Sequence, residues 1–288
     1  MRVTAFAPAK VNLYLHVTDR RADGYHLLDS LVAFADIADR LTVEPAPCLS
    51  LVVDGPEAAD LAAVRDDNLV LRAARLLADR AGITNGAALH LEKHLPVAAG
   101  IGGGSSDAAA ALLALKQLWR IPLDDEALCA LAAGLGADVP ACLYGRAVWV
   151  GGIGERLEAA GPLPEAGILL VNPRTALPTA AVFAARRGPF GHVGRFAPMP
   201  KEASGLARAL MPCRNDLTEA AIGLVPEVAA VQARLGRLPG SLLARMSGSG
   251  ATCFALFADC AAAEGARAVV AAAEPRWWCA AGGFVSGS

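Results

Sequence analysis

A glycine-rich segment, residues 96–107, carries the clearest chemical signal in the sequence. It reads PVAAGIGGGSSD, and it precedes a run rich in alanine and leucine that is typical of a helix. Glycines leave backbone N–H groups open and allow positive φ angles, and a helix start adds unpaired N–H groups and a positive dipole end. This combination binds anions, above all phosphate. The segment therefore predicts a phosphate-binding loop, to which Ser105 and Ser106 add two hydroxyl groups. The alternative is a flexible loop with a serine helix cap.

Several better-known motifs do not match this segment. A Walker A loop requires a lysine after its glycines, and none follows here. The dinucleotide fingerprint G-x-G-x-x-G fails because, counted from Gly100, its last position is Ser105. The nucleophile elbow G-x-S-x-G fails around Ser105 because its last position is Asp107, and the protein-kinase motifs are absent from the sequence. The loop therefore belongs to a different class of phosphate site.

The elements that must position this loop mix strands and helices. Residues 11–17 alternate apolar and polar side chains, which predicts a half-buried strand with Lys10 and Asn12 on its polar face. Further strands are expected at residues 41–44, 49–53, 89–92, 146–150, 167–171 and 253–257. Helices are expected at residues 66–81, 107–119, 125–135, 179–187, 202–210, from 217 onward and at 261–273.

The expected ends of these elements suggest two domains. Asp66 or Asp67 can cap the first helix and Gly82 can end it. Glycines and prolines between residues 151 and 164 break the pattern, so we expect an N-terminal domain over residues 1–154 and a C-terminal domain over 155–288. Strands and helices alternate without regular βαβ spacing, which favours an α+β fold. A second glycine-serine loop at 246–250 leads into the strand at 253–257.

Composition narrows the class of protein. Hydrophobic residues make up 55% and charged residues 19% of the chain, which is typical of a folded core. The net charge of −2 and scattered basic residues argue against a nucleic-acid partner. Seven cysteines without a C-x-x-C pair favour buried, reduced thiols and a reducing compartment, and disfavour zinc. The N-terminus resembles a strand more than a signal peptide, and no apolar run reaches the roughly 20 residues of a membrane helix, so a soluble cytoplasmic protein is expected.

The glycine-rich segment resembles the phosphate loop of the GHMP kinases, whose pattern is P-x-x-x-G-L-G-S-S-A. Here Pro96 is followed by three residues, by G-I-G and by two further glycines before the serines. This longer form resembles the branch that acts on a cytidine-diphosphate-linked methylerythritol. Asp107 stands where that branch frequently has asparagine, and Ala98 and Ala99 replace glycines often seen there. Four other segments, in the expected order, resemble the same proteins: residues 7–13 (APAKVNL), 21–26 (RADGYH), 136–140 (GADVP) and 247–253 (SGSGATC).

The resemblance implies a fold and a set of site residues. It implies an N-terminal domain like domain 2 of ribosomal protein S5, a ferredoxin-like C-terminal domain and an active site in the cleft between them. ATP would lie on Pro96, Val97, Ala98, Ala99, Gly100, Ile101, Gly102, Gly103, Gly104, Ser105 and Ser106. No protein ligand to a metal is expected, and Mg²⁺ would bridge the β- and γ-phosphates.

Two residues are assigned to the reacting centre by the resemblance. Asp138 would be the general base that accepts the proton of the attacking hydroxyl. Without the resemblance, a helix cap or a turn is the favoured interpretation of Asp138. Lys10 would keep this carboxylate ionised and stabilise the incoming oxygen, and its alternative is a solvated lysine at a strand end.

The resemblance assigns five residues to binding the substrate that accepts the phosphate. Tyr25 offers a ring that can stack on cytosine and His26 an imidazole that can hydrogen-bond its edge, with Asn12 assisting. The alternative from the residues alone is a surface tyrosine and a solvated histidine. Thr179 and Phe183 lie in a segment where the resembled proteins add substrate contacts, although a helix-capping threonine and a core phenylalanine would look the same in the sequence.

The resemblance implies a kinase that phosphorylates the 2-hydroxyl of this small-molecule acceptor in non-mevalonate isoprenoid synthesis. Two alternatives remain open at this point. One is a kinase of the same superfamily acting on homoserine, mevalonate or a sugar, which the two extra glycines and the D-G-Y-H turn disfavour. The other is a regulator that binds ATP without transferring phosphate, which the presence of both Lys10 and Asp138 disfavours.

Overall fold

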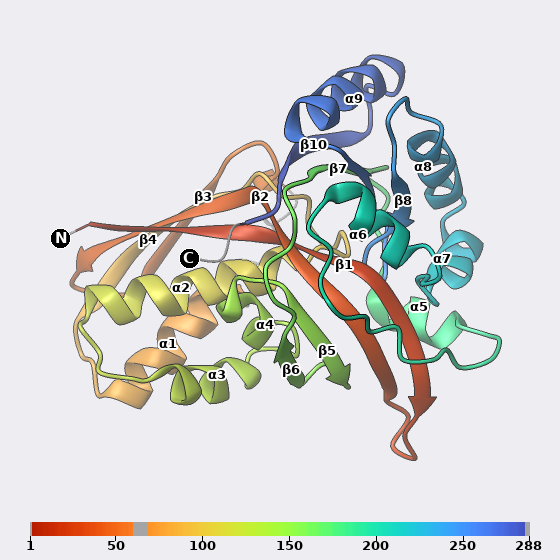
Figure 1. Cartoon of the computed structure of the whole chain (residues 1–288). Coiled ribbons are helices and arrows are strands. Elements are labelled where there is room, and N and C mark those ends of the chain that lie inside the picture. The colour runs from red at the N-terminus through yellow and green to blue at the C-terminus, as the bar shows by residue number, and fades with distance from the viewer. Residues whose placement is uncertain (1, 60–67, 286–288) are drawn as a thin grey trace. The chain divides into compact units, whose positions relative to one another are not determined.

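The computed structural model describes residues 2–59 and 68–285, and Figure 1 shows the mixture of strands and helices that the sequence predicts for an α+β fold. The strands are β1 (Val3–Arg20), β2 (His26–Ala46), β3 (Ser50–Asp54), β4 (Gly86–Glu92), β5 (Val148–Gly152), β6 (Arg156–Ala159), β7 (Gly167–Asn172), β8 (Leu243–Met246), β9 (Cys253–Phe257) and β10 (Trp278–Gly283). The helices are α1 (Leu69–Ala81), α2 (Gly103–Leu118), α3 (Asp125–Ala133), α4 (Val139–Tyr144), α5 (Thr179–Ala185), α6 (Ala203–Leu210), α7 (Thr218–Leu224), α8 (Glu227–Gly236) and α9 (Cys260–Ala273).

The chain folds into two compact units, each built from several segments. The first unit contains Met1–Ala9, Ala38–Val97 and Gly102–Gly145. The second contains Lys10–Ile37, Ala98–Ile101 and Arg146–Ser288. The long strands β1 and β2 contribute residues to both units, as does the glycine-rich segment. The division of the sequence at residue 154 stays a prediction.

The first unit packs helices against a small sheet. The C-terminal half of β2 pairs with β4 in antiparallel register, Arg40 opposite Glu92, and β3 joins β4 in parallel register. Helix α1 packs against α2, and α2 against α4. Asn68 caps α1 by accepting a hydrogen bond from the amide of Val70, and Gly82 ends it in the left-handed conformation. The prediction for Gly82 is confirmed, and Asp66 and Asp67 lie outside the described residues.

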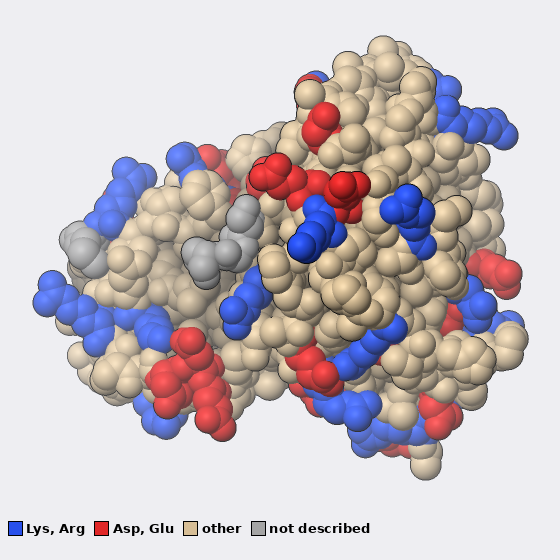
Figure 2. Space-filling view, viewed as in Figure 1, with Lys and Arg blue, Asp and Glu red and all other residues tan. Residues whose placement is uncertain are grey.

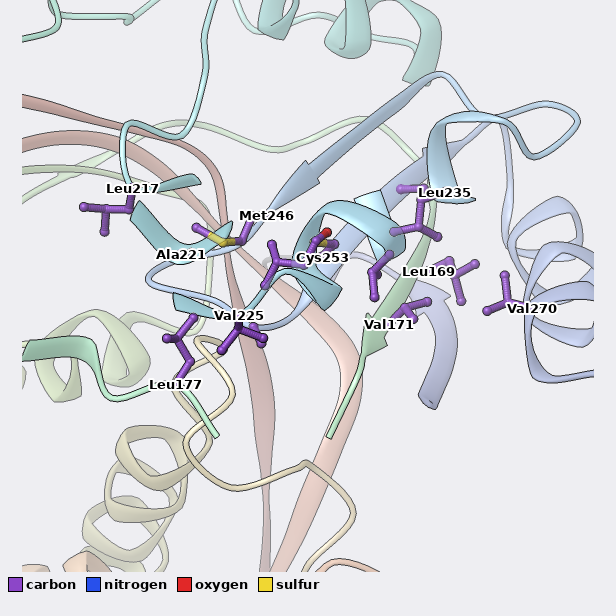
Figure 3. Packing of buried hydrophobic residues seen from close by; sticks show 14 of the residues in the cluster. Leu169, Val171, Leu177, Leu217, Ala221, Val225, Leu235, Met246, Cys253 and Val270 are labelled. Atoms are coloured by element: carbon purple, nitrogen blue, oxygen red, sulfur yellow. The ribbon is translucent and has the colours of Figure 1, made fainter. Parts of the chain in front are cut away.

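The second unit is built on a four-stranded antiparallel sheet in the order β10-β7-β9-β8. Helices α8 and α9 cover one face of it, because alternate strand residues and the inner faces of both helices are apolar. Figure 3 shows this core, in which Leu169 and Val171 of β7 lie among Leu235 of α8, Cys253 of β9 and Val270 of α9. The same unit contains the N-terminal half of β2, which pairs with β5, and the hairpin of β5 and β6.

The structure corrects several predicted boundaries. Helix α2 begins at Gly103, four residues before the expected residue 107. Strand β2 begins at His26, whereas the sequence indicated a strand only from residue 41, because the apolar run at residues 31–35 shows no alternation. The sequence analysis missed α4, β6, β8 and β10. The edge strands β6 and β8 have four residues each, too few for a clear period.

Surface properties agree with the composition. Figure 2 shows lysines and arginines scattered among aspartates and glutamates on the face in view.

The cysteines are free, and Cys142, Cys213 and Cys253 are buried. Cys48 and Cys260 are exposed, which corrects the expectation that the thiols are buried. In the part of the chain that the structure describes, no helix is both long enough and apolar enough to cross a membrane.

Candidate active site

The start of α2 has the geometry of an anion site. Gly102 is the N-cap residue, with φ +63°, and no side chain caps the helix. The first turn consists of Gly103, Gly104, Ser105 and Ser106, so the glycines that the sequence placed in a loop supply the first amides of the helix. The amides of Gly103, Gly104 and Ser105 have no intrahelical acceptor, whereas that of Ser106 donates to the carbonyl of Gly102 at 2.8 Å. The open amides sit at the positive end of the helix dipole. The arrangement can bind phosphate oxygens through the backbone.

The two serines of this turn differ in what they contact. The hydroxyl of Ser106 donates to the carbonyl oxygen of Pro8 at 2.7 Å and lies 3.3 Å from the sulfur of Cys142. Ser106 is buried, so its hydroxyl fixes the start of α2 to β1 and α4. Ser105 is half-buried. A phosphate contact from this turn would therefore use the Ser105 hydroxyl and the backbone.

The preceding residues of the segment pack against the second glycine-serine loop within the second unit. The hydroxyl of Ser247 donates to the carbonyl of Gly100 at 3.2 Å, and the amide of Thr252 donates to the carbonyl of Ala99 at 3.2 Å. A Cβ at Gly100 would lie 2.4 Å from the carbonyl oxygen of Gly250, so only glycine fits. Ala98 has φ +52°, a conformation that suits glycine better than alanine.

Lys10 lies beside the same segment. Its backbone amide donates to the carbonyl of Ile101 at 2.9 Å, which fixes β1 to the glycine-rich segment. The Lys10 side chain is buried, not solvated as a lysine at a strand end would be. The structure therefore excludes the surface interpretation of this residue.

Asp138 occupies the N-cap position of α4 in the first unit. Its side chain makes no capping hydrogen bond to the helix, although its carbonyl accepts from the amide of Cys142 at 3.1 Å. The residue is half-buried, which leaves part of its carboxylate accessible. The simple capping interpretation is therefore wrong for the side chain.

Two of the residues predicted to bind the acceptor substrate have stacked rings. His26 stacks on Phe183, with ring centroids 5.3 Å apart and planes at 26°. Burial lowers the pKa of His26, and the positive charges of Arg20 and Arg186 lower it further, so the imidazole is held neutral near pH 7. Tyr25 lies in the adjacent turn with 62% of its surface exposed, and its ring is free to contact a ligand face.

Asn12 and Thr179 join a hydrogen-bond network around the second loop. The amide of Asn12 donates to the Ser247 hydroxyl at 3.1 Å, and its side-chain nitrogen donates to Ser30 at 2.8 Å. The side-chain oxygen of Asn12 is buried and bonds no atom of the described residues, so it can accept a hydrogen bond from a ligand. The hydroxyls of Thr179 and Ser249 are hydrogen-bonded at 2.8 Å, so Thr179 does not cap α5.

The sequence analysis missed a buried charge cluster under the glycine-rich helix start. Lys93 pairs with Asp39 at 2.5 Å and with Asp107 at 2.7 Å, and all three side chains are buried. The sequence offered one weak signal, a lysine directly after the strand that leads into the segment. Ser30, which holds Asn12, was also not predicted, and Ser249 was singled out only as part of the second glycine-serine loop and not as the partner of Thr179.

Comparison with known proteins agrees with this geometry. The family model described as the N-terminal domain of GHMP kinases matches residues 68–146, and the model described as their C-terminal domain matches residues 201–275. A protein of Cereibacter sphaeroides named 4-diphosphocytidyl-2-C-methyl-D-erythritol kinase is 55% identical over 286 residues, covering 96% of this chain and 97% of that protein. A protein of the same name from Rhodospirillum rubrum is 55% identical, covering 96% and 90%.

A solved structure shows the same likeness in three dimensions. The crystal structure of a 4-(cytidine 5'-diphospho)-2C-methyl-D-erythritol kinase superposes with a TM-score of 0.81 at 39% identity, covering 99% of this chain and all of that one. The fold, the glycine-rich helix start and these matches define the class of protein. The chain belongs to the GHMP kinase family, whose members are ATP-dependent small-molecule kinases.

Proposed function

We propose that the chain phosphorylates the 2-hydroxyl of 4-diphosphocytidyl-2-C-methyl-D-erythritol with ATP, as a step of non-mevalonate isoprenoid precursor synthesis. The likeness over nearly the whole chain to proteins named for this substrate is the observation that supports it most. The free cysteines favour a reducing compartment, and we place the enzyme in the cytoplasm.

The phosphates of ATP would lie on residues 96–106. The open amides at the start of α2 would hold phosphate oxygens. Asp138 would accept the proton of the acceptor hydroxyl, and Lys10 would stabilise the incoming oxygen. Mg²⁺ would enter with the nucleotide and would supply positive charge that reduces the repulsion between the phosphates and the incoming oxygen.

The acceptor would be held by residues of the second unit. The exposed ring of Tyr25 would stack on cytosine, and the neutral imidazole of His26, steadied by Phe183, would hydrogen-bond the base edge. The side-chain oxygen of Asn12, which has no hydrogen-bond partner among the described residues, would accept a hydrogen bond from a ligand hydroxyl. Thr179 would add a hydroxyl beside Ser249. The turn at 247–250 contacts both Asn12 and Gly100, which supports the placement of acceptor and phosphate residues around one loop.

The variant Asp138→Asn tests the assigned chemistry. We expect kcat for the cytidine substrate to fall by about 10²- to 10⁴-fold, with the dissociation constant of ADP unchanged, because only the proton acceptor is lost. Asp125→Asn, which changes a fully exposed carboxylate of α3, is the control and should keep kcat. A kcat of Asp138→Asn within about twofold of wild type would contradict the role of Asp138.

A further inference from the structure

A buried group of three charges supports the start of α2, and the proposed chemistry does not use it. Lys93, Asp39 and Asp107 are 2%, 0% and 3% exposed. The nitrogen of Lys93 lies 2.5 Å from Asp39 Oδ2 and 2.7 Å from Asp107 Oδ2. One ammonium group thus serves two carboxylates that are both removed from water.

This triad lies directly beneath the glycine-rich segment. A Cβ on Gly103, the first residue of α2, would lie 3.2 Å from the Lys93 nitrogen and 4.0 Å from Asp39 Oδ2. Asp39 Oδ1 accepts hydrogen bonds from the amides of His94 and Leu95, at 2.5 and 2.8 Å, just before the segment begins. Asp107 is the fifth residue of α2, about 6 Å along the helix axis from Gly103.

The charges of the triad do not balance when both carboxylates are ionised. One positive and two negative charges leave an excess of one negative charge close to amides that would bind phosphate. Asp107 Oδ1 is buried and has no hydrogen-bond partner among the described residues. Burial raises the pKa of Asp107 to about 7, Lys93 opposes the rise, and Asp39 adds to it.

We propose that Asp107, held in place by Lys93, weakens the binding of nucleotide phosphates at the start of α2 and thereby speeds the release of ADP. The excess negative charge of the triad, close to the amides at the start of α2, repels an anionic ligand there, and low-dielectric surroundings screen that repulsion poorly. Asp107 is a positioning residue, because it acts through the field at the helix amides without touching the nucleotide. The inference rests on the proposed function only in that this segment binds ATP phosphates.

Nucleotide binding to Asp107→Asn tests this inference without any acceptor. Dissociation constants of Mg-ADP, Mg-ATP and adenosine are measured by calorimetry and competition at pH 8, where the wild-type carboxylate is mostly ionised. We expect ADP and ATP to bind about three- to tenfold more tightly to Asp107→Asn, and adenosine to bind equally to both proteins, because only a charged ligand senses the removed charge. Stopped-flow displacement should show slower ADP release by a similar factor.

Two controls separate charge from structure. Asp125→Asn removes the same charge from a fully exposed side chain and should leave all three constants unchanged. Thermal unfolding checks that Asp107→Asn is folded. Equal or weaker ADP binding by Asp107→Asn, or an equal gain for adenosine, would overturn the inference. Tighter ADP binding in a protein that does not turn over the cytidine substrate would overturn the proposed acceptor and keep this inference.

Discussion

Two buried carboxylate networks in the molecule are satisfied in different ways. In the first unit, Asp107 depends on Lys93, which it shares with Asp39, and one of its oxygens has no partner among the described residues. In the second unit, Asp29 accepts from the Tyr14 hydroxyl at 2.6 Å and the Gly194 amide at 2.7 Å, and pairs with Arg195 at 3.3 Å.

The two carboxylates differ in the kind of donor that stabilises them. Asp29 is surrounded mainly by neutral donors, which stabilise a carboxylate without a buried counter-charge. The Lys93 network depends on ion pairing in a region removed from water, where removing one partner leaves the others uncompensated. Asp29 fixes the loop at 194–195 to β1, a structural task, whereas the Lys93 network lies under the candidate phosphate site. Substitutions in the two networks test this contrast.

Lys93→Met should give the largest loss of stability. It leaves two buried carboxylates without a counter-charge, and we expect the free energy of unfolding to fall by about 3–5 kcal/mol in urea titrations. Adding Asp107→Asn to Lys93→Met should recover part of this loss, because it removes one of the unpaired charges. Lys116→Met, which breaks a pair between a half-buried lysine and the fully exposed Asp125, is the control and should cost at most about 0.5 kcal/mol. A loss below 1 kcal/mol for Lys93→Met would contradict the picture of a buried ion network.

Asp29→Asn should cost less, about 2 kcal/mol, because the asparagine oxygen can still accept from Tyr14 and Gly194. The same unfolding experiment measures it. Glu158→Gln, which changes the exposed second partner of Arg195, serves as the control and should have an effect below about 1 kcal/mol. The contrast fails if Asp29→Asn destabilises the protein as much as Lys93→Met does.

The pH dependence of stability should identify Asp107. Because the fold raises the pKa of Asp107 from 3.8 to about 7, the native state retains a proton that the unfolded chain loses. The resulting stability is fully present below pH 3.8 and is lost as the pH rises through about 7. Relative to wild type, Asp107→Asn should therefore gain stability progressively between acid and pH 8, measured by urea unfolding at each pH. A constant difference across this range would show that Asp107 titrates normally.

Tyr14→Phe should have the smallest effect, about 1 kcal/mol, because it removes one of three donors to Asp29. Burial raises the pKa of Tyr14, and Asp29 raises it further, so the hydroxyl keeps its proton and donates throughout the accessible pH range. Tyr144→Phe, on a ring that is 38% exposed, is the control. An unchanged midpoint in Tyr14→Phe would mean that Gly194 and Arg195 satisfy Asp29 alone.

The sequence predicted the phosphate segment because its signal is local. Open glycines followed by strong helix formers indicate an anion site without knowledge of the fold, although glycine's low helix propensity hid the start of α2 at Gly103. The Lys93 network could not be predicted, because residues 39, 93 and 107 meet only through the pairing of β2 with β4 and the packing of α2. The stacking of His26 on Phe183 was hidden for the same reason. Contacts between residues that are distant in the sequence can be predicted only once the topology is known, whereas the phosphate-binding features of the glycine-rich segment lie in consecutive residues.

One measurement tests the central claim most directly. The purified protein is incubated with Mg-ATP and, in separate reactions, with 4-diphosphocytidyl-2-C-methyl-D-erythritol, homoserine or mevalonate, and ³¹P NMR follows the products. The account predicts ADP and a new phosphomonoester signal with the cytidine substrate alone, and none of this product with Asp138→Asn on the same timescale. Equal turnover of homoserine or mevalonate, or ADP release without a phosphorylated acceptor, would contradict it.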